Sequence, residues 1–147
     1  MIINLIILFY FILCITVCIY DIRYRTIPNK TIKIIFFLSI ITSVYQGYFL
    51  NSTLYFIYTL VTFLIFWYLG LIGGGDVKAI CSFTIGIKPD LIVFYFISIG
   101  LIGAVQVMFM LTYDYFFKKS KIKIGIPYGI PISISGVILV FLSLVMN

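Results

Sequence analysis

The chain has 147 residues, of which 64% are hydrophobic and only 10% are charged, and its mean hydropathy is +1.27. A soluble domain of this length needs far more polar residues to cover its core, so the composition excludes an ordinary water-soluble enzyme or binding module. The net charge of +6 does not indicate nucleic-acid binding. The Lys and Arg residues lie in short stretches between apolar blocks, a pattern that reports membrane orientation and contact with anionic lipid.

The apolar blocks follow one another along the chain, most of them near the roughly 20 residues that a helix needs to cross the hydrocarbon of a bilayer. The first has no basic residue before it and no small-residue cleavage site, so we expect a retained helix rather than a secretory signal. Between the second and third blocks the sequence predicts a short turn at Asn51–Ser52. The expected helices cover residues 2–20, 31–50, 53–72, 76–87, 91–113 and 126–146.

The fourth of these segments is the shortest, about 18 Å long at 1.5 Å per residue, which is less than a full span. The distribution of Lys and Arg between the two sides of the membrane indicates whether this segment crosses. If all six segments cross and the N-terminus is outside, Lys88 alone among the basic residues lies outside. With five crossings, the run Lys118–Lys123 would move to the outer face. The residues then expected on the cytoplasmic side are Arg23, Arg25, Lys30, Lys33, Lys78, Lys118, Lys119, Lys121 and Lys123.

We therefore predict an all-α fold, a polytopic membrane bundle of about six transmembrane helices with a short fourth helix. Residues 1–147 are expected to form a single membrane-embedded domain in the cell membrane, with both termini outside. The three cysteines, Cys14, Cys18 and Cys81, form no CxxC pair, so packing is expected of them rather than metal binding or redox chemistry. The chain contains no histidine and no glutamate. We expect neither a metal nor another cofactor.

Two of the four acidic residues are expected to lie at the same depth. Asp21 follows the first helix at its cytoplasmic end, and Asp76 begins the fourth helix at that same end. Asp90 falls on the opposite face, and Asp114 is expected at the start of the basic loop. Asp21 and Asp76 are therefore the candidate chemical pair.

Two close carboxylates cannot both ionise cheaply, so such a pair tends to share one proton. The ionised member can then activate a water while the protonated member donates a proton, and no covalent intermediate is needed. The residues alone leave open which Asp acts as the base. Gly73, Gly74 and Gly75 precede Asp76 and would allow close helix approach. The simpler interpretations are a solvated helix cap at Asp21, a packing turn at the glycines and an orientation charge at Lys78.

Three sequence elements together are similar to a known family. Asp21-Ile22-Arg23 with Ile27-Pro28-Asn29, then Gly73-Gly74-Gly75-Asp76-Val77-Lys78, then Ile126-Pro127-Tyr128-Gly129-Ile130-Pro131 occur in that order. The chain resembles the type IV prepilin peptidases, the GxGD class of membrane aspartyl proteases.

By this resemblance Asp21 and Asp76 are the catalytic pair, and the residues expected to shape the site or bind substrate are Gly73, Gly75, Lys78, Pro127 and Gly129. The implied partners, besides the lipid bilayer, are prepilins, pseudopilins or preflagellins. They would be cut at the cytoplasmic face, between a short basic leader and an apolar helix. Larger members carry an N-terminal extension with paired CxxC motifs and also N-methylate the product. Without those motifs, a peptidase-only form is expected.

Two other classes of protein remain as alternatives. A proton- or cation-coupled transporter would hold its acids near the bilayer midplane and would usually show two repeated halves. No convincing repeat is present, and both candidate acids lie at expected helix ends. A non-catalytic subunit of a pilus or secretion assembly is the other alternative. The sequence does not decide the oligomeric state.

Overall fold

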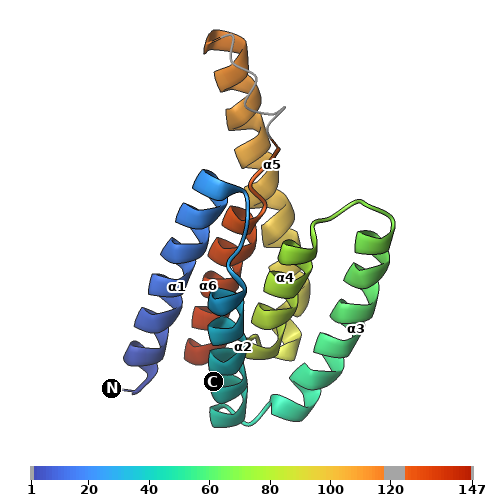
Figure 1. Cartoon of the computed structure of the whole chain (residues 1–147). Coiled ribbons are helices and arrows are strands. Elements are labelled where there is room, and N and C mark those ends of the chain that lie inside the picture. Colours follow the sequence, from blue (N-terminus) through green and yellow to red (C-terminus); the bar gives the residue numbers. More distant parts are fainter. Residues whose placement is uncertain (1, 118–124, 147) are drawn as a thin grey trace.

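The structure is a computed structural model that describes residues 2–117 and 125–146. Within these residues the fold is entirely helical and contains no strand, which confirms the predicted all-α class (Figure 1). The basic run Lys118–Lys123 lies outside the described residues. The elements are α1 (Ile2–Tyr24), α2 (Asn29–Tyr45), α3 (Phe49–Tyr68), α4 (Gly74–Gly86), the short 3₁₀ turn η1 (Pro89–Leu91), α5 (Ile92–Phe117) and α6 (Gly129–Val145).

The described helices have the length and surface of a membrane protein. Three segments are long and apolar enough to cross a bilayer by length and composition, Ile3–Tyr24, Phe49–Tyr68 and Pro89–Phe116, and α6 is a shorter apolar helix. Large apolar side chains cover the outside, whereas Ser39, Thr42 and Ser133 are fully buried. Small polar residues between helices and apolar residues on the surface are typical of a bundle surrounded by lipid.

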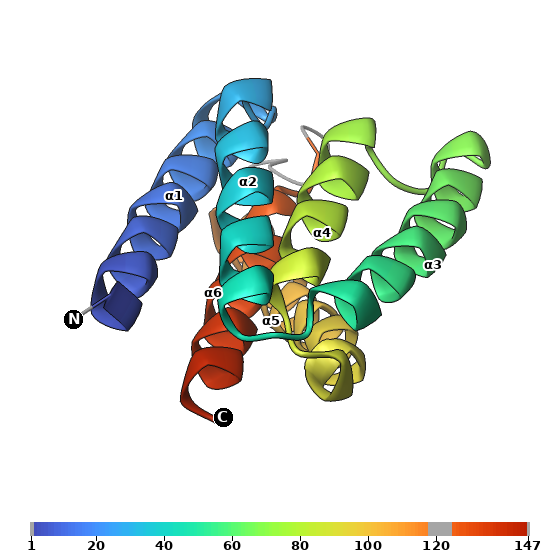
Figure 2. The same cartoon turned by 90° about the horizontal axis from the view of Figure 1, so that it is seen from below.

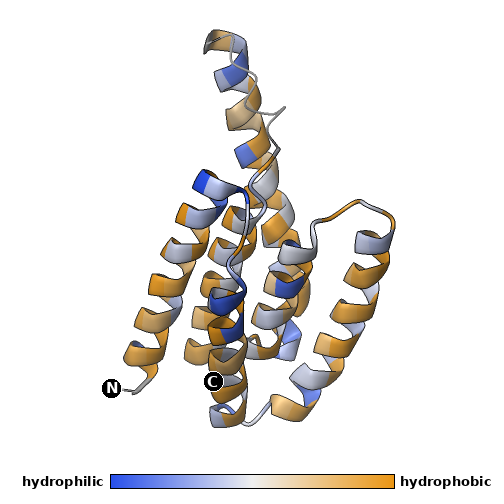
Figure 3. Ribbon diagram, viewed as in Figure 1, coloured by the Kyte–Doolittle hydropathy of each residue, from blue (hydrophilic) through white to orange (hydrophobic). Residues whose placement is uncertain are grey.

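Successive helices run in opposite directions, so helix ends that are far apart in sequence lie at the same end of the bundle. The end of α1 and the beginnings of α4 and α6 lie at one end, and both chain termini lie toward the other (Figures 1 and 2). Hydrophilic residues gather where α1 ends and α2 begins, while the helices are otherwise mostly apolar (Figure 3). We call this end of the bundle, marked by Asp21, Arg25 and Asp76, the polar end.

The short fourth helix is the centre of the core. Every residue from Val77 to Ile87 is buried except Lys78. α4 packs against α2, α3 and α6, and α1 packs against α6 and α2. Because its neighbours enclose it, α4 does not need the length of a lipid-exposed helix. The sequence prediction of a short fourth helix ending near Ile87 is confirmed.

Two helices, α1 and α5, end later than the sequence predicts, and both differences concern acidic residues. α1 continues past residue 20 to Tyr24, so Asp21 lies in its last turns rather than after it, and α5 continues past residue 113 to Phe117, so Asp114 is helical. A change from apolar to polar side chains does not end a helix, because the backbone hydrogen bonds continue through it. The polar residues mark the end of the apolar block and not the end of the helix.

The turn between α2 and α3 is also displaced. It falls at Gln46–Tyr48 instead of Asn51–Ser52. Gly47 adopts φ +79° there, and the N–H of Tyr48 donates to the carbonyl of Ser43 at 3.2 Å, which is how glycine commonly ends a helix. Ser52 lies inside α3, where its hydroxyl donates to the carbonyl of Ile87 at 3.2 Å.

Candidate active site

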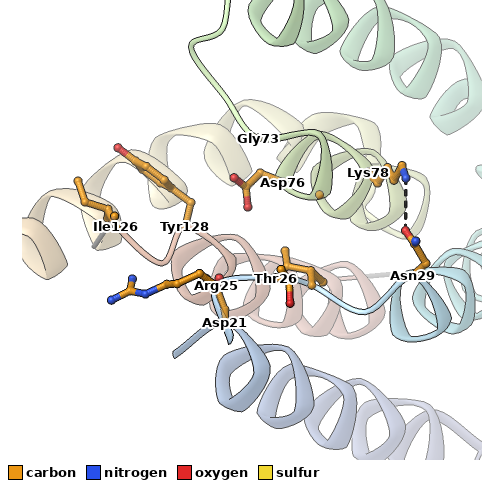
Figure 4. Close-up of a pocket in the computed structure, with 12 residues that line it drawn as sticks. Asp21, Arg25, Thr26, Asn29, Gly73, Asp76, Lys78, Ile126 and Tyr128 are labelled. Carbon is orange, nitrogen blue, oxygen red and sulfur yellow. Dashed lines mark hydrogen bonds between the residues drawn. The ribbon is translucent and has the colours of Figure 1, made fainter. Parts of the chain in front are cut away.

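A cavity of about 540 Å³ lies at the polar end. It is bounded by the end of α1, the beginnings of α2 and α4, and the chain that leads into α6. Its lining residues are Asp21, Arg25, Thr26, Ile27, Asn29, Gly73, Gly75, Asp76, Lys78, Gly125, Ile126 and Tyr128. The structure therefore brings Asp21 and Asp76 to one cavity, although 55 positions separate them in the sequence (76 minus 21; Figure 4).

The Asp21 carboxylate is held by the beginning of α6. Its side chain is 5% exposed, and the backbone N–H of Gly129 donates to its Oδ2 at 2.6 Å. The first N–H groups of a helix have no partner within the helix, and they carry the positive end of the helix dipole. A Cβ at Gly129 would lie 2.7 Å from that same Oδ2. A larger residue at this position would therefore displace the Asp21 carboxylate, and Gly129 is a direct neighbour of the candidate acid.

The Asp76 carboxylate lies over the chain that begins α4. The N–H of Asp76 donates to the carbonyl of Gly73 at 3.0 Å, and its side chain points into the cavity (Figure 4). A Cβ at Gly73 would lie 3.0 Å from Asp76 Oδ2, so this glycine leaves room for the carboxylate. Asp76 is in the first turn of α4 and lies outside the three candidate spans. Burial, followed by the nearby Asp21, raises the pKa of Asp76 to about 6.

A sharp turn at the end of α1 carries the chain along the cavity wall. Arg25 adopts φ +55°, a left-handed conformation that is uncommon for a residue with a side chain. Its N–H donates to the carbonyl of Asp21 at 3.1 Å, which closes the last turn of α1. Pro28 then continues in extended conformation and α2 begins at Asn29. The Lys78 ammonium donates to Asn29 Oδ1 at 3.3 Å, so Lys78 links α4 to α2 beside the cavity (Figure 4).

The segment before α6 forms the remaining wall. Pro127 is buried, and its carbonyl accepts a hydrogen bond from Gln106 Nε2 of α5 at 3.0 Å. Tyr128 lines the cavity between Pro127 and Gly129. The residue-by-residue prediction did not include Gln106 or Tyr128. Tyr128 could have been predicted from its place within the Pro- and Gly-containing segment. Nothing in the sequence indicates a role for Gln106, because its partner is 21 positions away.

The five residues expected to shape the site lie in different relations to the two acids. Gly73 and Gly129 each border one carboxylate, and Lys78 lines the cavity. Pro127 does not line the cavity, and its contact with the site is through the chain that leads to Gly129. Gly75 lines the cavity, but a Cβ there would meet Ile27 at an ordinary 3.9 Å, so it borders neither carboxylate. Two carboxylates that line one cavity are the residue types that general acid–base catalysis with water uses.

Comparison with known families gives one match. The model of the type IV leader peptidase family matches residues 8–108, a range that includes both Asp21 and Asp76. Comparisons with curated proteins and with solved structures yield no significant match. The matched range covers more than half of the chain, and the apolar helices fit an integral membrane peptidase. The chain belongs to the type IV leader peptidase family.

Proposed function

We propose that the protein is an aspartyl endopeptidase that removes the short basic leader of prepilin-like membrane proteins, with Asp21 and Asp76 as its catalytic pair. The observation that carries the proposal is the shared cavity at the polar end of the bundle, which is lined by Asp21 of α1 and Asp76 of α4. The family match supports peptidase chemistry. The substrate class rests on the resemblance of the three sequence elements to prepilin peptidases.

The different surroundings of the two acids favour different roles. Asp21, which accepts the N–H of Gly129, is the better place for a negative charge, because helix N-termini stabilise anions. Asp76, with its pKa raised to about 6, holds a proton more readily than an ordinary aspartate. In this proposal Asp21 is the general base and Asp76 the general acid.

The reaction then needs no covalent intermediate. Asp21 takes a proton from water, and the water oxygen bonds to the scissile carbonyl carbon while Asp76 gives its proton to the carbonyl oxygen. The tetrahedral intermediate collapses when one of its hydroxyl groups returns a proton to Asp76. The C–N bond breaks, and the proton held by Asp21 passes to the leaving amine. The products are the free leader and a membrane protein with a new N-terminal amine.

The test is co-expression with a panel of epitope-tagged candidate prepilins from the source genome, each having a short Lys- or Arg-containing leader before an apolar helix. Asp21→Asn and Asp76→Asn should each abolish leader removal while the protein still inserts in the membrane. Loss of a general acid or base typically costs about 100- to 10,000-fold in rate. Leader removal is read as a mobility shift and confirmed by N-terminal sequencing.

The two remaining aspartates supply matched controls. Asp90 lies in η1, and Asp114 lies near the end of α5 and not among the cavity residues. Asp90→Asn and Asp114→Asn should therefore process the substrate at the wild-type rate. Full processing by either Asp21→Asn or Asp76→Asn would refute the catalytic pair. Equal loss in all four variants would indicate a general effect of removing charge.

A further inference from the structure

A second cavity adjoins the first, and its lining is apolar. Its volume is about 340 Å³, and it lies between α3 and α5, with α4 and α6 behind it. We call it the apolar groove. Its lining residues are Phe63, Leu71, Ile72, Asp76, Ile80, Phe96, Ile99, Gly100, Tyr128 and Ile132. Asp76 and Tyr128 line both cavities, so the groove leads directly to the candidate catalytic acid.

The groove is open at the surface of the bundle. Leu71 is 68% exposed and Gly100 is also exposed. Phe63 of α3 and Phe96 of α5 stack with their ring centroids 5.7 Å apart, which joins the two helices away from the polar end. Gly100 has no side chain, and a Cβ built there meets no atom within 4 Å. The missing side chain leaves the space on α5 open.

We infer that the apolar groove binds the apolar segment that immediately follows the scissile bond of the substrate. The inference rests on the proposed function. The first cavity contains charged side chains and the groove is apolar. A substrate of the proposed kind has the same two parts, a basic leader before the scissile bond and an apolar helix after it. With the leader in the polar cavity and the apolar segment in the groove, the scissile bond lies beside Asp76. A substrate helix reaches this position from the bilayer, between α3 and α5.

The first test fills the groove without touching either carboxylate. Gly100→Trp places a large side chain in open space. We expect the rate of cleavage of a prepilin from the panel that the wild type cleaves to fall by at least about tenfold, the equivalent of roughly 1.4 kcal/mol of lost binding. Leu101→Trp is the matched control, since Leu101 is the next residue of α5, is 64% exposed and does not line the groove. It should cleave within about twofold of wild type. Wild-type cleavage by Gly100→Trp, or equal loss in both variants, would overturn the inference.

The second test detects the occupant directly and does not depend on the fold of the Gly100 variant. A photo-cross-linking amino acid replaces Leu71 in the Asp21→Asn background, so that the prepilin is not consumed. The same replacement at Val105, which is 68% exposed on α5 and outside the groove, is the control. We expect an adduct with the tagged prepilin from position 71 and none from position 105. Adducts with lipid alone, or equal prepilin adducts from both positions, would refute the groove as a substrate site.

The two proposals fail in different ways. If wild type cleaves no prepilin of the panel, the proposed function fails, while an adduct at position 71 alone would still establish the groove as a binding site for the apolar segment. If wild type cleaves and both Asp variants do not, but neither groove test responds, the peptidase assignment stands and the groove assignment is wrong.

Discussion

Gly73 and Gly75 both precede Asp76 and are both predicted to shape the site, but their surroundings in the structure differ. A Cβ on Gly73 would lie 3.0 Å from Asp76 Oδ2, whereas a Cβ on Gly75 would lie 3.9 Å from its nearest neighbour, the Cβ of Ile27. The first distance requires the carboxylate to move, and the second is ordinary van der Waals contact. At the residue scale, the two glycines should therefore differ in their tolerance of alanine.

We expect Gly73→Ala to lower the cleavage rate several-fold, because the Asp76 carboxylate must move by a fraction of an ångström and a misplacement of about 1 Å can cost on the order of 100-fold. Gly75→Ala should stay within about twofold of wild type, since alanine fits there and is the better helix former. The measurement is the initial rate of leader removal at equal amounts of inserted protein. Equal losses in the two variants would show that the carboxylate contact at Gly73 is not the cause.

The pH dependence of cleavage follows from the environment of Asp76. Its pKa is raised from 3.8 to about 6 by burial and by the nearby Asp21, so its protonated form predominates below about pH 6 and is lost as the pH rises. If Asp76 is the general acid, the cleavage rate should fall above about pH 6, approaching tenfold per pH unit. The apparent value belongs to the pair of acids. Rates measured between about pH 5 and 8 check this, and a flat profile would contradict the assigned role.

At the scale of elements, the beginning of α6 is positioned by α5. Gln106 donates to the carbonyl of Pro127 at 3.0 Å, two residues before the N–H that holds Asp21. The chain from Pro127 to Gly129 thus connects α5 to a candidate catalytic carboxylate of α1. Gln46 provides a comparison, because it donates to the carbonyl of Leu144 at 3.4 Å near the other end of α6.

We expect Gln106→Met to lower the rate at saturating substrate about fivefold with an unchanged KM, since a hydrogen bond of this kind contributes about 1 kcal/mol. Gln46→Met removes a similar bond to α6 far from the polar end, so it should affect thermal stability without affecting the cleavage rate. Steady-state kinetics and thermal unfolding of both variants give the answer. A rate loss in Gln46→Met as large as in Gln106→Met would mean that general loosening of α6 is responsible.

At the scale of the whole molecule, the orientation in the membrane decides where a substrate is cut. The polar end holds Arg25 and Lys78 beside the two acids, and Lys88 lies toward the other end, where its ammonium donates to the carbonyl of Met146 at 3.4 Å. Positive residues favour the cytoplasmic side. We therefore propose that the polar end faces the cytoplasm and that both termini face outward.

A C-terminal alkaline phosphatase fusion should accordingly be active in cells, and a green fluorescent protein fused at the same point should be dark. The same reporters inserted into the segment 118–123 should give the opposite result, which makes that insertion an internal control. If the phosphatase fusion is inactive and the green fluorescent protein fusion is fluorescent, the orientation is the reverse of the one proposed and the cavity lies outside the cell.

The class of the fold and the identity of the candidate pair follow from the sequence alone. Long apolar blocks require helices in a bilayer, because backbone groups in lipid must form their hydrogen bonds within the segment. Counting alternating crossings was enough to predict Asp21 and Asp76 at one end, and the structure brings both to one cavity. Their catalytic role stays a prediction, as do the membrane orientation and the absence of methyltransferase activity.

Features that depend on contacts between distant segments are visible only in the folded chain. The hydrogen bond from Gly129 to Asp21 joins residues 108 positions apart, and no local pattern encodes it. The end of α1 was mispredicted because hydropathy reports contact with lipid, whereas backbone hydrogen bonds determine where a helix ends. The difference between Gly73 and Gly75, the bond from Gln106 and the apolar groove all arise from packing. Spacing along the chain cannot measure the distances between side chains that packing brings together.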